Sequence, residues 1–492
     1  MQKKVNIKKL TIRYVIYLIA VSSVVYCIFF FPSITKQKPS SDDWFMLEIA
    51  KELYNKPLEN WIIIKDPFNQ WRPLPFILKA LYLRGENRDL VLYNTFKLSI
   101  FVGIVILLYF TSKLFLKDRE AAFLSALFFL LNPTNIGAVQ NIDHIFKLTG
   151  TFFYGITIVF LYLYFTREKQ KTIHIIICFL SYTIGFISDA DAVAAFPAVF
   201  LLTIFNFWNK KVLFRKSAVI IFISLLIVVL YLYLRSIIVG GAFSGGLSGK
   251  QDIVLSFNIL YNSFKLLVSS FIFSVSPYIY FHKPFYVALG IFFFIVNVAV
   301  ISIGIFRSLN EQRRILILLL ILAFIAMTPF VFIRHVSEIY SIRSTYLLMI
   351  ILAYSYVLLY KVSGERLKNI IVIFCVLMLI SGAYSLKVKQ DMLLKRGLMA
   401  ENMARSMVRA VPNPPPFSTI NLKIDNCGVK DTYSEFISSD FHLTGGIIIF
   451  FVRYNYDDET LNSVNNPKNV YNLKWDCNKR QFLLLSKAGN DF

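Results

Sequence analysis

Apolar runs recur along most of this sequence, and short polar stretches separate them. A helix needs roughly 20 residues to cross the hydrocarbon core of a membrane, and the runs approach this length. The pattern therefore predicts an α-helical polytopic membrane protein with about eleven spans. The predicted spans are residues 14–31, 90–110, 121–135, 145–165, 173–187, 193–207, 218–238, 285–306, 315–333, 346–360 and 370–386.

One further apolar segment, residues 253–280, is interrupted by polar side chains and by Pro277. If this segment crossed the membrane once, the next loop, with Arg307, Arg313 and Arg314, would face outward. Basic loops favour the cytoplasmic side. We therefore expect an amphipathic or re-entrant element at the outer face, because irregular backbone at membrane depth has to be shielded by protein.

Lysine and arginine are distributed unevenly over the loops, and this sets the orientation. Basic residues between Lys3 and Arg13 precede the first span, which indicates an uncleaved signal anchor with a cytoplasmic N-terminus. The predicted outward loops 132–144 and 188–191 contain no lysine or arginine. The predicted inward loops contain Lys113, Lys117, Arg119, Arg167, Lys169, Lys171, Lys210, Lys211, Arg215, Lys216, Lys361, Arg366 and Lys368. The same alternation puts the C-terminus outside.

The last part of the chain has the composition of a soluble domain. A basic, helix-like stretch at 387–410 is followed by a proline-rich break and by short strand-like runs at 419–424, 446–454 and 481–485. We expect a small extracytoplasmic α+β domain at 387–492, after a membrane module at 1–386 whose first outer loop, with juxtamembrane helices, spans 33–89. Cys427 and Cys477 lie in this domain and could form a disulfide outside the cytoplasm, whereas in a reducing compartment they would stay free.

Composition excludes a soluble globular protein, because 57% of the residues are hydrophobic, only 16% are charged, and the mean hydropathy is +0.60. The formal net charge of +23 could indicate nucleic acid binding. However, the basic residues are scattered over short loops rather than gathered on one domain. The charge therefore reflects orientation in a lipid bilayer, and no nucleic acid partner is expected.

The polar loop after the first span contains the acidic pair Asp42 and Asp43, followed by Trp44. These residues could begin a surface helix, with Ser41 or Asp42 as its N-cap. Alternatively, two adjacent carboxylates near a membrane surface could supply a general base or hold a divalent cation against a phosphate. The sequence shows no Cys/His metal cluster and no glycine-rich nucleotide loop, so no other cofactor is expected.

The same loop ends in Trp71-Arg72-Pro73-Leu74. Tryptophan and arginine often mark the headgroup level of a membrane. The guanidinium of Arg72 is also suited to a phosphodiester, because its planar fork can bond two oxygens at once. Both interpretations stay open from the residues alone.

The order of these features resembles the GT-C class of glycosyltransferases. The acidic pair, the Trp-Arg-Pro-Leu motif and residues 132–139 are similar to motifs of the transmembrane tetratricopeptide-containing O-mannosyltransferases and their bacterial relatives. Trp71 replaces the usual tyrosine, Ala190 stands where the group has lysine before the acidic position of Asp191, and the tetratricopeptide tail is absent. The layout is also similar to that of phage serotype-converting O-antigen glucosyltransferases.

The resemblance implies transfer of a sugar, usually with inversion, from a polyprenyl-phosphate-linked donor to an extracytoplasmic acceptor. A surface glycan such as O-antigen, and glucose as the sugar, are favoured. The bacterial inner membrane, with the active site on the periplasmic face, is the implied location. The implied base is Asp42 or Asp43. The implied donor phosphate ligands are Arg72, Arg343, Arg235 and Lys147. Weaker candidates for substrate contact are Trp44, Trp71, His144, Asp191, Arg334 and His335.

Two other functions are compatible with the sequence. A polysaccharide ligase or polymerase also joins lipid-linked sugars outside the cell, and it would depend on Arg334, His335 and Arg343 rather than on the aspartates. A lipid-sugar transporter or flippase is disfavoured, because the spans contain few charges and no paired, similarly interrupted halves are found.

Overall fold

The structure is a computed structural model. Besides Tyr17, Val21, Val24 and Lys36, it describes residues 53–54, 56–63, 71–82, 90–141, 144–166, 172–209, 214–240, 258–274, 284–332, 338–411, 418–423, 469–476, 479 and 481–489. Most of the first predicted span lies outside the described residues. So do the candidate residues Asp42, Asp43, Trp44, Arg334, His335, Cys427 and Cys477.

Seven helices of the described part are long and apolar enough to cross a membrane. The chain is therefore an integral, multi-pass membrane protein with a mostly helical fold. These helices are α6 (Leu90–Leu116), α9 (Ile145–Thr166), α12 (Phe214–Val239), α15 (Pro284–Arg307), α16 (Asn310–Val331), α17 (Ile342–Val362) and α18 (Glu365–Ala410). The shorter apolar helices are α5 (Pro73–Tyr82), α10 (Thr172–Ser188) and α11 (Ala195–Trp208). A short helix α4 (Glu59–Ile63) precedes α5, and α13 (Asn258–Phe271) precedes α15.

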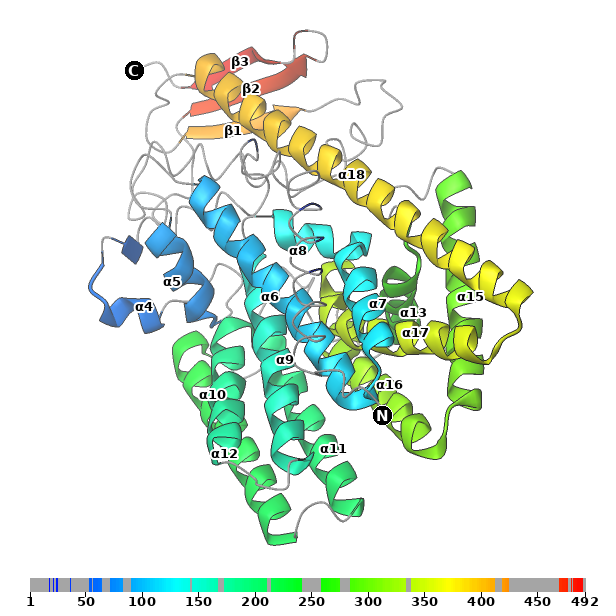
Figure 1. Ribbon diagram of the computed structural model, residues 1–492. Helices are drawn as coiled ribbons and strands as arrows, with labels where there is room; N and C mark the ends of the chain where they lie inside the picture. Colours follow the sequence, from blue (N-terminus) through cyan, green and yellow to red (C-terminus); the bar gives the residue numbers. More distant parts are fainter. Residues whose placement is uncertain are drawn as a thin grey trace.

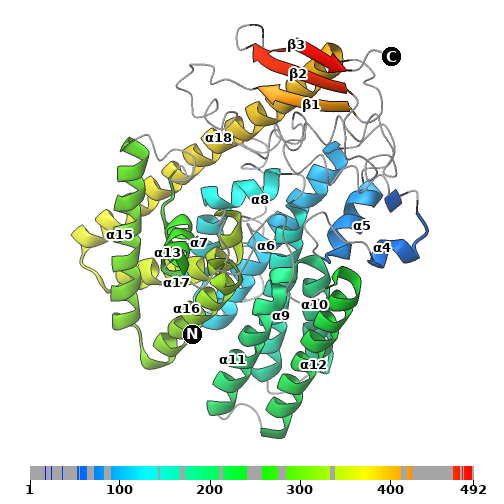
Figure 2. The same ribbon diagram turned by 180° about the vertical axis from the view of Figure 1, so that it is seen from behind.

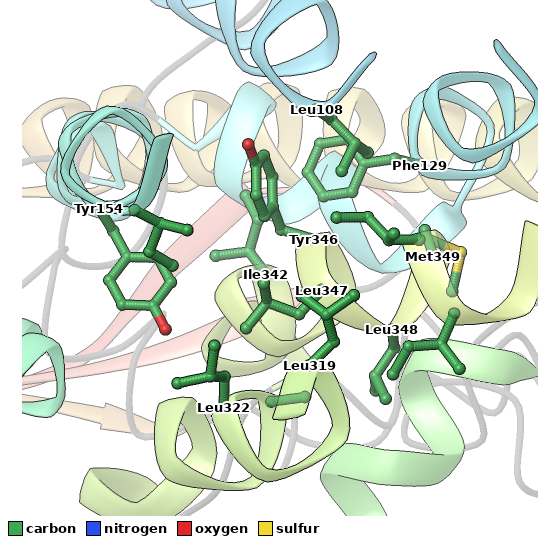
Figure 3. Packing of buried hydrophobic residues seen from close by; sticks show 14 of the residues in the cluster. Leu108, Phe129, Tyr154, Leu319, Leu322, Ile342, Tyr346, Leu347, Leu348 and Met349 are labelled. Atoms are coloured by element: carbon green, nitrogen blue, oxygen red, sulfur yellow. The ribbon is translucent and has the colours of Figure 1, made fainter. Parts of the chain in front are cut away.

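The helices form two neighbouring groups (Figures 1 and 2). Helices α9, α10, α11 and α12 lie side by side in one group. Helices α15, α16 and α17 lie in the other, and α6 with α7 (Arg119–Leu130) runs between the groups. The core is centred on α17, where 89% of the span is buried. Figure 3 shows Tyr346 and Leu347 of α17 packed between Phe129 of α7 and Leu319 of α16.

The predicted span at 121–135 is shorter than expected, because α7 ends at Leu130. Pro133 cannot continue a helix, and the chain bends by 48° into the 3-10 turn η2 (Pro133–Asn135) and the short helix α8 (Ile136–Gln140). Side chains bind the exposed carbonyls of this bend: Lys389 Nζ donates to Pro133 O at 2.7 Å and Lys97 Nζ to Asn141 O at 2.6 Å. The irregular backbone is thus shielded by protein, as membrane depth requires.

Helix α18 contains 46 residues, which corresponds to a length of about 69 Å. It continues without a break across the predicted boundary between residues 386 and 387 and crosses the molecule from α15 to the small C-terminal sheet (Figure 1). Gly382 allows this close packing, because a Cβ there would lie 2.5 Å from Leu131 O. The long helix therefore joins the membrane module directly to the sheet.

The sheet has the order β1-β2-β3, with β1 (Ser418–Lys423) parallel to β2 (Asn469–Asp476) and β2 antiparallel to β3 (Gln481–Gly489). Strands β1 and β3 fall on predicted runs, whereas β2 was not predicted from the sequence. Its buried residues Tyr471 and Leu473 alternate with polar ones. The backbone N–H of Phe482 donates to Ser406 Oγ and holds β3 against α18.

Candidate functional site

Three charged side chains meet inside the helix bundle although they are far apart in the sequence. Lys147 lies in the first turn of α9, Asp189 directly follows α10, and Arg343 is the second residue of α17. Lys147 Nζ lies 3.2 Å from Asp189 Oδ2, and Arg343 Nη2 donates to the same oxygen. The three side chains are no more than 2% exposed. A carboxylate thus bridges two buried cations.

A second carboxylate completes the group, which we call the charge cluster: Lys147, Asp189, Asp191 and Arg343. Lys147 Nζ also donates to Asp191 Oδ2, and the Asp191 side chain is 29% exposed. The two aspartates are held in place locally. Asp189 N donates to Gly185 O at 3.0 Å, which extends the end of α10, and Asp191 N donates to Asp189 Oδ1 at 3.3 Å. This turn leads into η3 (Ala190–Ala194) and then α11.

Aromatic rings surround the Lys147 ammonium. Its Nζ lies 4.8 Å from the ring centroid of Phe146, 4.5 Å from that of Phe330 and 5.0 Å from that of Tyr340. Cations are attracted to ring faces at these distances. Because Lys147, Asp189 and Arg343 are also buried, the Coulombic interactions among them are stronger than at the protein surface.

Arg72 reaches the same place from the start of α5. Its guanidinium carbon lies 4.1 Å above the centroid of Phe146, next to Lys147. The neighbouring Trp71 donates from Nε1 to Ile62 O at 2.7 Å and stacks on Tyr231 of α12, with centroids 5.5 Å apart. Trp71 therefore anchors this loop to the bundle and fixes the position of Arg72.

Arg235 lies one turn after Tyr231 on α12. Arg235 itself is buried. Of the four predicted phosphate ligands, Arg72 and Lys147 meet at the Phe146 ring, and Lys147 and Arg343 meet at Asp189, so three cations lie together and outnumber the two carboxylates. Among the described residues, the Tyr231 hydroxyl has no hydrogen-bond partner.

Helix electrostatics also favours an anion at the charge cluster. Arg72 immediately precedes α5, Lys147 is the third residue of α9, and Arg343 is the second residue of α17. The N-terminus of a helix carries a partial positive charge, so it disfavours cations and attracts anions. Three helix N-termini with three cations therefore outweigh the two carboxylates of the site.

The carboxylate of Asp189 is the counter-charge in this site. Burial alone would raise its pKa, but the nearby charges of Lys147, Arg343 and Arg72 outweigh burial and lower the pKa of Asp189 to about 2. Two donor atoms of Arg343, Nε and Nη1, are buried and have no hydrogen-bond partner within the described part of the chain. Buried donors are normally satisfied, so this guanidinium has binding capacity beyond Asp189.

His144, a weaker candidate for substrate contact, makes hydrogen-bond contacts within the bend before α9. Its Nδ1 lies 3.1 Å from Gly137 O and 3.1 Å from Asn141 Nδ2. Lys97 also binds this bend and is fully buried between α6 and α8. These contacts support α8 and the start of α9, so they position Lys147.

Asp189 was not predicted as a site residue, and the sequence contained only a weak indication of it. The resemblance to glycosyltransferases pointed to Asp191, two positions later. The indication was the pair of carboxylates in a loop without lysine or arginine, directly after an apolar run. Within its described residues, the structure contains no group of three or more His, Cys, Asp or Glu side chains that could hold a metal ion.

Comparison with solved structures identifies the class of fold. ArnT from Cupriavidus metallidurans in the apo state is similar with a TM-score of 0.51 and 13% identity, over 94% of this chain and 93% of that one. Archaeal oligosaccharyltransferase AglB from Archaeoglobus fulgidus, in complex with an inhibitory peptide and a dolichol-phosphate, gives a TM-score of 0.50 and 11% identity, over 95% of this chain and 69% of that one. No family model and no curated protein sequence matches this chain. The chain thus has the GT-C glycosyltransferase fold, and the resemblance noted in the sequence is confirmed at the level of the fold.

Proposed function

We propose that this protein is a membrane glycosyltransferase that uses a polyprenyl-phosphate-linked sugar. The observation that supports this function most directly is the charge cluster together with Arg72, where three buried cations near helix N-termini face two carboxylates. Such a site favours a phosphate group. The bound dolichol-phosphate in the AglB structure is a lipid phosphate on a protein of similar fold.

The donor phosphate would replace the aspartates as the binding partner of these cations. Lys147 and Arg343 would exchange contacts with Asp189 for contacts with phosphate oxygens, with Arg72 above Phe146 as the third cation. When the bond between the anomeric carbon and the phosphate oxygen breaks, the leaving phosphate gains negative charge. Cations already in position stabilise this charge without reorganising, and this lowers the barrier to transfer.

The acceptor hydroxyl would attack the anomeric carbon and lose its proton to a base. Asp189 is poorly suited to this task, because the neighbouring cations stabilise its ionised form and make it a weak base. We therefore assign the base to Asp42 or Asp43, which lie outside the described residues. The resemblance favours an inverting reaction, glucose as the sugar and O-antigen or another surface glycan as the acceptor.

The resemblance favours a location in a bacterial inner membrane, and the distribution of basic loops supports a site on its periplasmic face. The charge cluster lies next to loop 188–191, which is a predicted outward loop without lysine or arginine. A divalent cation at the acidic pair would be an addition to this site rather than a requirement of the cluster.

The test uses membranes that contain the protein, a polyprenyl-phosphate glucose donor and a candidate lipid-linked glycan, with product analysis by mass. Asp42→Asn and Asp43→Asn should leave membrane insertion intact, and at least one should abolish transfer. Asp391→Asn is the matched control, because Asp391 is half-exposed and pairs with Lys387 rather than with a member of the cluster. Full activity of the Asp42→Asn/Asp43→Asn double variant would contradict the assigned base.

The same preparation distinguishes the other two functions. A ligase or polymerase would lose activity on Arg334→Ala or His335→Ala and keep it in the aspartate variants. A flippase would move the lipid-linked sugar across sealed vesicles in the absence of any acceptor. Either outcome, without sugar transfer, would replace the glycosyltransferase assignment.

A further inference from the structure

Gly150 lies where α9 passes the guanidinium of Arg343. A Cβ atom at this position would lie 2.5 Å from Arg343 Nη2, 2.9 Å from Asp189 Cβ and 3.3 Å from Asp189 Oδ2. Favourable contacts between heavy atoms begin at roughly 3.5 Å. A single methyl group would therefore overlap the two partners of the central ion pair.

The position of Gly150 on α9 relates it to the rest of the charge cluster. It follows Lys147 by three residues, so both face the same side of the helix. Glycine inside a helix is less stable than alanine by about 1 kcal/mol, so helix propensity does not favour it here. Gly155 of the same helix is also tightly packed, but its neighbours are Leu107 and Tyr346 rather than charged groups.

We propose that Gly150 is a positioning residue for the donor phosphate. Gly150 has no side chain, so the Arg343 guanidinium can pass α9 and reach Asp189. In this position Nε and Nη1 of Arg343 lie inside the cluster and have no other partners among the described residues. A methyl group would move the guanidinium, since it lies at the flexible end of its side chain. Asp189 would shift less, because its Cβ is attached to the backbone. The inference rests on the proposed function, since it assigns Arg343 to the lipid phosphate.

The experiment measures binding of undecaprenyl phosphate to the purified protein in nanodiscs. Polyprenol of the same length, which lacks the phosphate, is the matched ligand. Gly150→Ala should weaken binding of the phosphate by about tenfold or more, as expected for loss of a charged hydrogen bond, and leave polyprenol binding unchanged. Gly290→Ala in α15 is the control variant, because a Cβ there meets Ile272 at an ordinary distance of 3.6 Å.

A double variant tests whether Gly150 acts through Arg343. Glutamine is shorter than arginine, so Gly150→Ala should add no further loss to Arg343→Gln. If Gly150→Ala alone does not fold, recovery of the folded Gly150→Ala/Arg343→Gln protein supports the overlap, and failure of both overturns the inference. Wild-type affinity of Gly150→Ala, with weak binding by Arg343→Gln, also overturns it but leaves the phosphate site intact. Wild-type affinity of Arg343→Gln contradicts the proposed phosphate site itself.

Discussion

Helix α17 has a group of ion pairs at each end, and the two groups differ in solvent exposure and in how their charges match the helix dipole. At its last turn, Lys361 Nζ lies 2.7 Å from Asp118 Oδ2 and 3.0 Å from Glu120 Oε2, and its side chain is 47% exposed. Asp118 also caps α7, accepting from the backbone N–H of Glu120 at 2.9 Å. At its first turn, Arg343 is buried against Asp189.

At the exposed end, each charge agrees with helix electrostatics. Lys361 is a cation at a helix C-terminus, and Asp118 is an anion at a helix N-terminus, so both are favourable without any ligand. At the buried end, Arg343 and Lys147 are cations at helix N-termini and have also lost their hydration. A buried ion pair adds little net stability over apolar residues of similar volume. The exposed group is therefore accounted for by stability, whereas the buried one indicates a binding role.

The largest effect is expected from Asp189→Asn. The substitution removes the carboxylate that neutralises two buried cations, which should destabilise the protein by about 3–5 kcal/mol and abolish transfer. Denaturant or thermal unfolding of the purified protein measures the first effect, and the sugar-transfer assay measures the second. If Asp189→Asn were as stable as the wild type, breaking the buried ion pairs would cost no more free energy of unfolding than breaking the exposed ones.

Lowering the pH should also distinguish the buried end of α17 from the exposed end, by a smaller effect on stability than Asp189→Asn. The pKa of Asp189 is lowered to about 2 by the nearby cations, below the value of about 3.9 for an unfolded aspartate. A lowered pKa in the folded state means that the stabilising contribution is complete above pH about 4 and is lost as the pH falls towards 2. Melting temperatures between pH 5 and 8 should therefore not respond to this group. The loss of stability in acid should be smaller in Asp189→Asn than in the wild type. An equal loss in the two proteins would mean that other carboxylates cause it.

The smallest effect is expected from Lys361→Ala at the exposed end. Solvent-exposed ion pairs contribute about 0–1 kcal/mol, and the cap formed by Asp118 remains in the variant. The small difference in melting temperature should shrink further at high salt, because salt screens exposed charges. A loss of stability as large as that of Asp189→Asn would remove the distinction between the two ends of α17.

The sequence predicted the helices well where the prediction depended on neighbouring residues. Each predicted span from residue 90 onward overlaps a helix, since a long apolar run is a local property. The end of α7 was placed too late, although Pro133 was visible, because the apolar run continued past Leu130. Strand β2 was missed, although its buried residues Tyr471 and Leu473 alternate with polar ones as in a half-buried strand.

The site was predicted only in part. The resemblance selected Arg72, Lys147, Arg235 and Arg343, and the fold brings Arg72, Lys147 and Arg343 together at Phe146 and Asp189. The resemblance pointed to Asp191, and no residue pattern indicated that Asp189 would be the more deeply buried carboxylate. The importance of Gly150 was equally hidden, because it follows from an arginine on another helix.

The sequence by itself determined that this chain resides in a membrane and where most of its helices lie, because burial in lipid requires long apolar runs and helical hydrogen bonding within each run. Only the tertiary structure decided which charges meet. Lys147 and Asp189 are 42 residues apart, and Asp189 and Arg343 are 154 residues apart. Their contact depends on how α9, α10 and α17 pack, and on a glycine that leaves room for a guanidinium between them.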